Sequence, residues 1–281
     1  AKGSGECDFA MEVAVAHPLR VLATILGVPR EQESRILELT NQIFASDDAE
    51  LGFQEEDRDA AIVRLGLEFY QMFEPIIADR RANPRNDLAS VLANGIVDGQ
   101  PMGPMETLGY YLITFSAGHD TTKNALVGGM RALLDNPEQL EKLKRSPELL
   151  DSAVEEVVRW TSPVNHMKRK VTQDYELRGQ KLRAGDWLVM FYASANRDEE
   201  IFEAPFEFRI DRNPNRHLGF GIGEHFCLGA NLARRSQRAL LHELMQRMEW
   251  AELTGDPEQI HSAFVVGLKK LPMRYRIRPV A

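Results

Sequence analysis

The feature that most constrains this chain is a glycine-rich turn that ends in a cysteine and runs directly into a helical pattern. Residues 220–229 read FGIGEHFCLG, and a helix is predicted from Ala230 to about Met248. In this position the sulfur of Cys227 meets free backbone N–H groups and the positive end of a helix dipole, and both favour a thiolate. A thiolate in such a turn is predicted to be a nucleophile or a metal ligand.

The surroundings of Cys227 narrow the choice of metal. Structural zinc needs further soft ligands in close pairs, but the other cysteine, Cys7, is far away in the sequence. Haem iron needs one protein ligand on its proximal side, and a Cys thiolate is one option. The glycines of the turn would let the backbone lie against a flat macrocycle, and Phe220 would shield the sulfur from water. These glycines are Gly219, Gly221, Gly223 and Gly229. For an isolated turn of this kind, a buried and inert cysteine remains the alternative.

The pattern Phe220-x-x-Gly223-x-His225-x-Cys227-x-Gly229 resembles the haem-binding loop of the cytochrome P450 monooxygenases. The resemblance extends from about Gly5 to Arg278, and it is greatest to the branch that hydroxylates terpenes such as terpineol. It implies heme b (iron protoporphyrin IX) as the cofactor and Cys227 as the iron ligand. The residues that it places around the cofactor are Arg169, Phe220, Gly223, His225, Cys227, Gly229, Ala117 and Gly118.

Length and charge set outer limits on fold and function. With 281 residues and 43% hydrophobic residues, the chain can build a sizeable core. The net charge of -8 argues against a nucleic-acid surface, and two distant cysteines argue against a disulfide framework. We find no apolar run of about 20 residues and no signal-peptide pattern. We therefore expect a soluble, cytoplasmic protein without a membrane anchor.

The apolar periodicity predicts a mainly α fold with a small β portion, which the resemblance makes the C-terminal two-thirds of the cytochrome P450 fold. Helices are predicted over Glu31–Phe44, Ala60–Ile77, Met105–Leu134, Leu149–Trp160 and from Ala230. Short strands are predicted over Lys170–Thr172, Tyr175–Gly179, Lys181–Leu182 and Trp187–Met190, and an edge strand over Arg274–Arg278. The polar stretch Asn83–Pro104 is expected to be an exposed connection.

The start of the chain suggests an incomplete domain. Ala1 is not a methionine, and the chain soon enters the periodic apolar stretch Val13–Leu26. The resemblance implies that an N-terminal third precedes this point, so residues 1–281 are expected to form one haem-thiolate domain that is N-terminally incomplete. Such a piece alone is expected to bind haem weakly.

Residues 117–122, AGHDTT, interrupt the long helical pattern with poor helix formers. A helix bulged near Gly118 would leave room for a small ligand, and a hydroxyl beside a carboxylate can pass protons. The alternative is a threonine bonded back to the preceding helical turn. The resemblance makes Thr121 the hydroxyl that steadies dioxygen and Asp120 the proton-relay acid, and His119 is expected to make only a local polar contact.

Three further sets of charged residues draw roles from the resemblance. Glu156 and Arg159 share a helix face and would be a weak surface pair on their own, but with Arg212 they match a buried network that braces the cysteine loop. His225 and Arg169, which precedes a predicted strand, suit the two haem propionates. A basic patch after the cysteine is expected to dock an acidic ferredoxin. It consists of Arg234, Arg235 and Arg238.

The resemblance implies insertion of one atom of dioxygen into a C–H bond of a small apolar substrate, a terpenoid or an alkyl-aromatic compound. No flavin or nicotinamide fingerprint is visible, so a 2Fe-2S ferredoxin and its reductase would supply two electrons. The apolar pocket is predicted to be walled by Leu112, Ile113, Phe115, Ala117, residues 164–167 and residues 263–266. Two alternatives share this ligation: a haem-binding sensor without turnover and a peroxide-driven peroxygenase. The pair Asp120 and Thr121 argues against both, because neither needs proton delivery.

Overall fold

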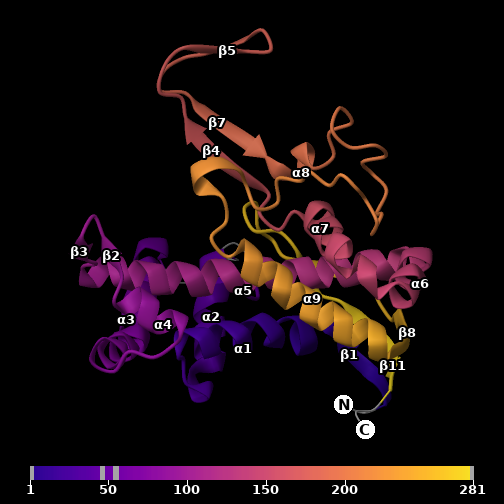
Figure 1. The fold of residues 1–281 in the computed structure, drawn as a ribbon, viewed down its shortest axis with the longest axis horizontal. Helices are drawn as coiled ribbons and strands as arrows, with labels where there is room; N and C mark the ends of the chain where they lie inside the picture. The colour runs from indigo at the N-terminus through magenta and orange to yellow at the C-terminus, as the bar shows by residue number, and fades with distance from the viewer. Residues whose placement is uncertain (1–2, 45–47, 53–56, 279–281) are drawn as a thin grey trace.

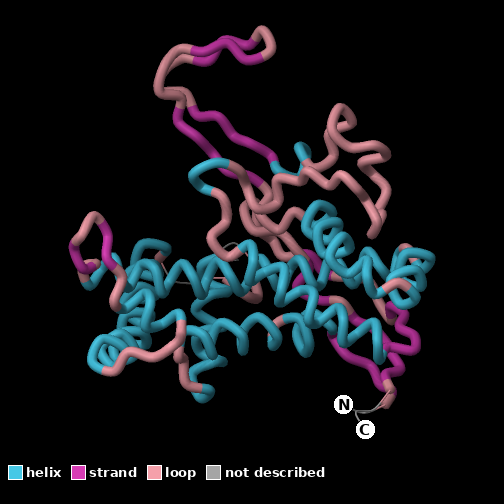
Figure 2. Tube along the Cα trace, in the orientation of Figure 1, coloured by secondary structure: helices cyan, strands magenta, loops and turns pink. Residues whose placement is uncertain are grey.

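The computed structural model describes residues 3–44, 48–52 and 57–278. The chain is mainly helical with several small antiparallel sheets, as the periodicity predicts (Figures 1 and 2). The longer helices are α1 (Ala16–Leu26), α2 (Glu33–Phe44), α3 (Arg58–Ala82), α5 (Pro104–Asp135), α6 (Pro137–Arg145), α7 (Leu150–Thr161) and α9 (Ala230–Arg247). The five predicted helices are therefore confirmed.

Helix α5 is the central element of the fold (Figure 1). Its 32 residues span about 48 Å at 1.5 Å per residue. Pro104 lies in its first turn, where a missing N–H costs nothing, and Asn136-Pro137 ends it. It packs against α1, α7 and α9, so it links the two apolar cores of the molecule.

The two cores lie along different halves of α5. Tyr111 and Phe115 in its first half pack with α1, α2, α3 and the short helix α4 (Leu88–Ala93). Leu126 and Met130 in its second half pack with α6, α7, α9 and the main sheet. Because one rigid helix contributes to both cores, its middle is held in a fixed position relative to each.

Two adjacent glycines bring α7 close to α5. A Cβ on Gly129 would lie 2.7 Å from Val157, and one on Gly128 would lie 2.6 Å from Thr161. Real side chains do not approach so closely, so the absence of a side chain at both positions permits this packing. Helix α7 carries Glu155, Glu156 and Arg159, and the glycine pair thus determines where these charges lie.

The main sheet has three strands, and its two edge strands are not the one that was predicted. β11 (Pro272–Ile277) is its central strand, with β1 (Ser4–Asp8) and β8 (Met248–Leu253) paired on either side. The expectation of an edge strand near Arg274 was therefore wrong. Sequence periodicity did not indicate β1 or β8, because both are half-exposed and pair with a segment distant in sequence.

The remaining strands form two-stranded ribbons. The strands predicted between residues 175 and 190 are confirmed as β5 (Tyr175–Leu177), β6 (Gln180–Leu182) and β7 (Trp187–Phe191), whereas the strand expected over Lys170–Thr172 lies earlier in the chain, as β4 (His166–Lys170). β4 pairs with β7 and β5 with β6, and both ribbons stand away from the helical body (Figure 2). Two further ribbons are β2 (Ile96–Val97) with β3 (Gln100–Pro101), and β9 (Glu258–Gln259) with β10 (Leu268–Lys270). The stretch 83–104 is thus not a plain loop, since it holds α4, β2 and β3.

One helical stretch, Phe9–Leu26, is long and apolar enough by composition to cross a membrane. It combines the π-helix η1 (Phe9–Ala14) with α1, and half of it is buried inside the fold. Glu12, His17 and Arg20 interrupt the stretch, so it is not the uninterrupted apolar run that the sequence analysis sought. In the structure the buried side of the stretch contributes to the cores, with Phe9 in one and Leu22 in the other.

Candidate functional site

The segment before α9 forms the tight turn that its glycines predict. Gly221 and Gly223 have φ values of 71° and 76°, a region that residues with a side chain rarely adopt. The backbone N–H of Cys227 donates to the carbonyl of Phe220 at 2.9 Å, which closes the loop. Cys227 therefore lies where the loop closes, three residues before α9 begins at Ala230.

Gly219 has a different role from the one expected for the glycines of the turn. A Cβ on Gly219 would lie 2.5 Å from Val158, so this glycine lets the loop pack closely against α7. A Cβ on Gly223 would meet no described atom within 4 Å, which leaves its open face available to a ligand.

The turn alone does not make Cys227 a thiolate. Burial around the sulfur raises the pKa of Cys227 above its ordinary value, and this outweighs the backbone N–H of Gly229 and the charge of Arg234, which both lower it. The backbone N–H of the turn thus favours the thiolate as expected, but burial opposes it more strongly. A bound cation would deprotonate the thiol, because coordination stabilises the anion directly.

The surface around Cys227 fits a flat, largely apolar cofactor with acidic edges. Ile222, Phe226 and Leu228 are 76%, 51% and 86% exposed, an unusual density of uncovered apolar side chains beside one sulfur. His225 is exposed in the same loop, and Arg169 is partly exposed. Apolar contacts, one sulfur ligand and two cationic or hydrogen-bonding groups are the set that haem requires.

Arg169 lies inside β4, opposite Leu188 of β7, whereas the sequence suggested that it precedes a strand. Its guanidinium donates to the carbonyl of Lys168 at 3.0 Å, a local bond that leaves other N–H groups of the side chain available. Its role toward a propionate stays a prediction.

On α5 the candidate proton-relay residues are buried and constrained. Oδ1 of Asp120 accepts from the ammonium of Lys123 at 2.6 Å, and within the described chain Oδ2 has no hydrogen-bond partner. Burial raises the pKa of Asp120, but Lys123 and the ring of His119 outweigh it and hold this pKa below its ordinary value. Asp120 is thus a carboxylate at neutral pH, with one oxygen free.

Thr121 adopts the alternative considered for it, because its hydroxyl donates to the carbonyl of Ala117 at 2.7 Å. His119 is fully buried and its Nε2 lies 3.3 Å from the carbonyl of Val15, which confirms a local polar contact. The bulge expected near Gly118 was wrong, since α5 is a continuous α-helix there. A Cβ on Gly118 would lie 3.1 Å from Leu22 of α1, so this glycine serves helix packing.

The network of Glu156, Arg159 and Arg212 is confirmed. Arg159 donates two bonds to the Glu156 carboxylate, at 2.7 and 2.8 Å, and Nε of Arg212 donates to it at 3.1 Å. Glu156 and Arg159 are fully buried, and the carboxylate also accepts from the backbone of Arg209 and from Asn215. The remaining N–H groups of Arg159 and Arg212 donate to backbone carbonyls between residues 196 and 207. The network therefore organises the irregular segment that leads to the cysteine loop.

The basic patch predicted after the cysteine is largely neutralised. Arg234 binds Glu155 and Arg238 binds Asp151, each at 2.6 Å. Arg235 is exposed, and within the described part of the chain no ion pair includes it. Glu155 was not among the predicted site residues, although its position directly before Glu156 on a charged helix was a usable signal.

The predicted pocket walls come together only in part. Val164 pairs with Val265, and the backbone N–H of Asn165 donates to the carbonyl of Phe264 at 2.9 Å, so segments 164–167 and 263–266 are neighbours. Phe115, in contrast, is fully buried in the core around α1 and α3, and Leu112 packs against that core. Ile113 is exposed on α5.

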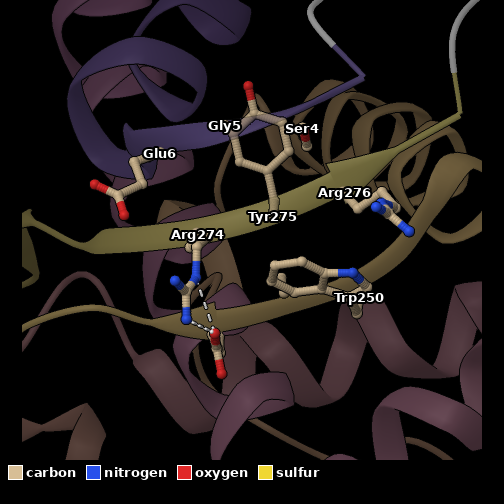
Figure 3. A pocket seen from close by; sticks show the side chains of 9 residues that line it. Ser4, Gly5, Glu6, Trp250, Arg274, Tyr275 and Arg276 are labelled. Carbon is tan, nitrogen blue, oxygen red and sulfur yellow. Dashed lines mark hydrogen bonds and ion pairs between the residues drawn. The ribbon is translucent and has the colours of Figure 1, made fainter.

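A hollow of about 710 Å³ lies on the main sheet, away from these residues (Figure 3). Trp250, Tyr275 and the ion pair of Arg274 with Glu252 line it. β8 begins where α9 ends, so the 18 residues of α9, about 27 Å, separate this sheet from the cysteine loop. The hollow does not belong to the candidate site.

Comparison with known proteins gives consistent matches along the chain. The sequence model of the family "Cytochrome P450" matches residues 67–277. Cytochrome P450-terp of a Pseudomonas species is 40% identical over 96% of this chain and 65% of its own length. The methyl-branched lipid omega-hydroxylase of Mycobacterium tuberculosis is 39% identical, over 96% of this chain and 63% of its own length.

Solved structures show the same fold. CYP108D1 from Novosphingobium aromaticivorans has a TM-score of 0.87 at 43% identity, over 98% of this chain and 64% of that protein. CYP268A2 of Mycobacterium marinum, solved with pseudoionone, has a TM-score of 0.90 at 34% identity, over 96% of this chain and 65% of that protein. The chain thus spans slightly less than two thirds of the curated relatives that it matches.

Proposed function

Because the chain belongs to the cytochrome P450 family, we propose that the whole protein is a haem-thiolate monooxygenase that hydroxylates a small apolar substrate. The observation that carries this proposal is the position of Cys227 among exposed apolar side chains, at the start of a helix that packs on α5. Helix α5 carries the pair of Asp120 and Thr121, which would supply protons to the reaction.

The cofactor of this family is haem, and the residues present fit it. When bound, haem supplies the redox chemistry by which one atom of dioxygen enters a C–H bond and the other leaves as water. Cys227 would ligate the iron, and Phe220, Gly223 and Gly229 would form the loop that faces the ring. His225 and Arg169 would bind the propionates, since both offer N–H donors to carboxylates.

Asp120 and Thr121, which both lie on α5, would hold and move protons for the reaction. The free Oδ2 of Asp120 is able to accept a hydrogen bond from water, and the Lys123 ammonium keeps this carboxylate ionised between turnovers. The hydroxyl of Thr121 would leave the carbonyl of Ala117 when a ligand oxygen offers a better acceptor. Ala117 would lie at the face of α5 nearest the cofactor, whereas Gly118 packs against Leu22 of α1.

The substrate is proposed to be a terpenoid or an alkyl-aromatic compound. Similarity to cytochrome P450-terp supports a terpenoid, and the structure of CYP268A2 with pseudoionone supports an apolar ligand in this fold. Apolar side chains of segments 164–167 and 263–266 would form one wall of its pocket.

The electrons are proposed to come from a 2Fe-2S ferredoxin and its reductase in the cytoplasm. No flavin or nicotinamide fingerprint occurs in residues 1–281, which supports an external donor for both electrons. Arg235 is exposed after Cys227, and no ion pair of the described residues includes it, so it offers a charge to an acidic partner.

The test is the spectrum of the reduced, carbon-monoxide-bound full-length protein. The parent should show a thiolate-type Soret band, and Cys227→Ser should abolish it together with turnover. Cys7→Ser is the matched control, because Cys7 lies on β1 in the main sheet and should leave the band unchanged. An unchanged band in Cys227→Ser would refute the ligation, and turnover with peroxide but not with reduced ferredoxin would refute the monooxygenase.

A further inference from the structure

Next to the buried network of Glu156 lies a second, separate network around Glu155. Glu155 is on α7, and both of its carboxylate oxygens are bound from other elements. Arg234 of α9 donates from Nε at 2.6 Å and from Nη2 at 2.9 Å, which is a bidentate pair. Nε2 of His217 lies 3.0 Å from the carboxylate. One side chain thus binds residues on both sides of Cys227.

The bonds around His217 form a consistent set. The backbone N–H of Gly219 donates to Nδ1 of His217 at 3.1 Å, so Nδ1 is the acceptor of the ring. Nε2 then carries the hydrogen and donates it to Glu155. Burial raises the pKa of Glu155, but His217 and Arg234 outweigh it and lower this pKa to about 2. The imidazole of His217 therefore donates a hydrogen bond to the ionised carboxylate of Glu155, and this bond needs no further proton.

Arg234 connects this network to the backbone of Cys227. Its guanidinium carbon lies 4.4 Å from the centre of the Phe220 ring, and the ring of His217 lies 5.8 Å from the same ring. The carbonyl of Phe220 accepts the N–H of Cys227. Phe220 is therefore held between two partners of Glu155 while its own backbone holds Cys227.

We propose that Glu155 is a positioning residue for Cys227. It fixes Arg234 and His217 on the two branches of the loop. Through Phe220 it sets where the sulfur lies, and it also sets how close the positive charge of Arg234 lies to the sulfur. This inference rests on the proposed function, in which Cys227 is the iron ligand. It adds a residue that does not contact the cofactor, because Glu155 acts only through Arg234, His217 and Phe220.

The chain offers a matched control in the ion pair of Asp151 and Arg238. This pair also joins α7 to α9, one helical turn away from Glu155 and Arg234 on each helix. Its side chains are 74% and 51% exposed, and neither residue takes part in the bonds of the loop. Asp151→Asn thus removes a cross-helix ion pair without touching the network of Glu155.

The experiment compares Glu155→Gln with Asp151→Asn in the full-length, haem-loaded protein. The first readout is hydrogen exchange of the loop amides, above all Gly219 and Cys227. We expect exchange about ten-fold faster or more in Glu155→Gln, because charge-assisted bonds that close the loop are lost. Asp151→Asn should exchange like the parent. Equal exchange in both variants would overturn the inference.

The second readout is the carbon-monoxide spectrum of the reduced protein. Glu155→Gln should shift a several-fold larger fraction of the Soret band from the thiolate to the thiol position than Asp151→Asn does. Arg234→Lys keeps the charge but loses the bidentate geometry, so it should show the same spectral defect. It also tests the proposal if Glu155→Gln does not fold. A parental spectrum in Arg234→Lys would contradict the proposal.

A double-mutant cycle separates this role from general stabilisation. Glu155→Gln and Arg234→Lys together should cost no more than either alone, because each breaks the same unit. Additive effects would refute the network as one unit. If the parent itself shows no thiolate band, the proposed function fails, whereas the exchange comparison still tests the network.

Discussion

At the scale of single residues, the polar side chains of the site already make hydrogen bonds within the protein. Asp120 has one oxygen on Lys123 and one free, and the hydroxyl of Thr121 is bound to Ala117. The two residues are therefore not equivalent in the resting protein. The carboxylate is ionised and has one oxygen that no described group binds, while the hydroxyl has to turn away from the helix before it contacts a ligand.

This difference predicts distinct defects in the full-length enzyme. Thr121→Ala should keep consuming reduced cofactor while hydroxylated product falls and peroxide rises, because the oxygen ligand loses its hydroxyl contact. Asp120→Asn should slow turnover itself by about ten-fold or more, because the amide cannot relay a proton. Cofactor oxidation, peroxide and product are measured together. Parental rate and coupling in both variants would show that this segment has no role in proton delivery.

Glu155 gives a prediction for the dependence of stability on pH. Its pKa is about 2 in the folded protein and about 4.3 in an unfolded chain. Its contribution is therefore present above the unfolded pKa and is lost as the pH falls toward 2. The midpoint of urea unfolding should fall less steeply with decreasing pH, between about pH 4.5 and 2.5, in Glu155→Gln than in the parent. Parallel curves would show that the Glu155 carboxylate gains no stabilisation on folding.

At the scale of elements, the contact between α5 and α7 decides where the charged networks lie. Glu155 and Glu156 are adjacent in sequence, but they point to different partners because α7 is held between α5 and α9. The glycine pair at 128 and 129 makes this close packing possible.

Two Gly→Ala substitutions on α5 should therefore have opposite effects. Gly129→Ala places a methyl 2.7 Å from Val157 and should destabilise the protein by about 1 to 3 kcal/mol. Gly109→Ala meets no described atom within 4 Å and should stabilise it by up to about 1 kcal/mol through helix propensity. Urea unfolding of both variants measures the difference. A neutral Gly129→Ala would mean that α7 shifts easily.

At the scale of the whole molecule, the net charge of -8 and the arginines after Cys227 affect association in opposite ways. Glu155 and Asp151 neutralise two of these arginines, so the local field for an acidic donor is weaker than the sequence suggests. The exposed Arg235 is the one of the three to which no described ion pair is assigned.

Arg235→Glu should lower the rate of electron transfer from an acidic 2Fe-2S ferredoxin several-fold at low salt, and the difference should shrink as ionic strength rises. Arg238→Glu should have a smaller effect, because its charge is already paired with Asp151. Stopped-flow reduction of the full-length protein at several salt concentrations tests this. Equal rates and salt dependence in the parent and Arg235→Glu would exclude this region as the docking surface.

Local pattern was sufficient for five of the helices, for the three strands between residues 175 and 191 and for the cysteine turn. Helical periodicity, Asn136-Pro137 and the glycines of 219–229 act over a few residues, so their effect can be predicted from neighbours in the sequence. The family resemblance added the roles of Glu156, Arg159 and Arg212, and the structure confirmed their burial.

Only the tertiary structure decided which side chains meet across elements. Strands β1 and β8 form because β11 lies between them, and Glu155 acquires Arg234 and His217 from segments 62 to 79 residues away. The same packing raises the pKa of Cys227 and neutralises two arginines. Burial and long-range pairing depend on the whole fold, whereas helix periodicity and turn chemistry depend on adjacent residues. This physical difference separates what the sequence by itself determined from what the assembled structure decided.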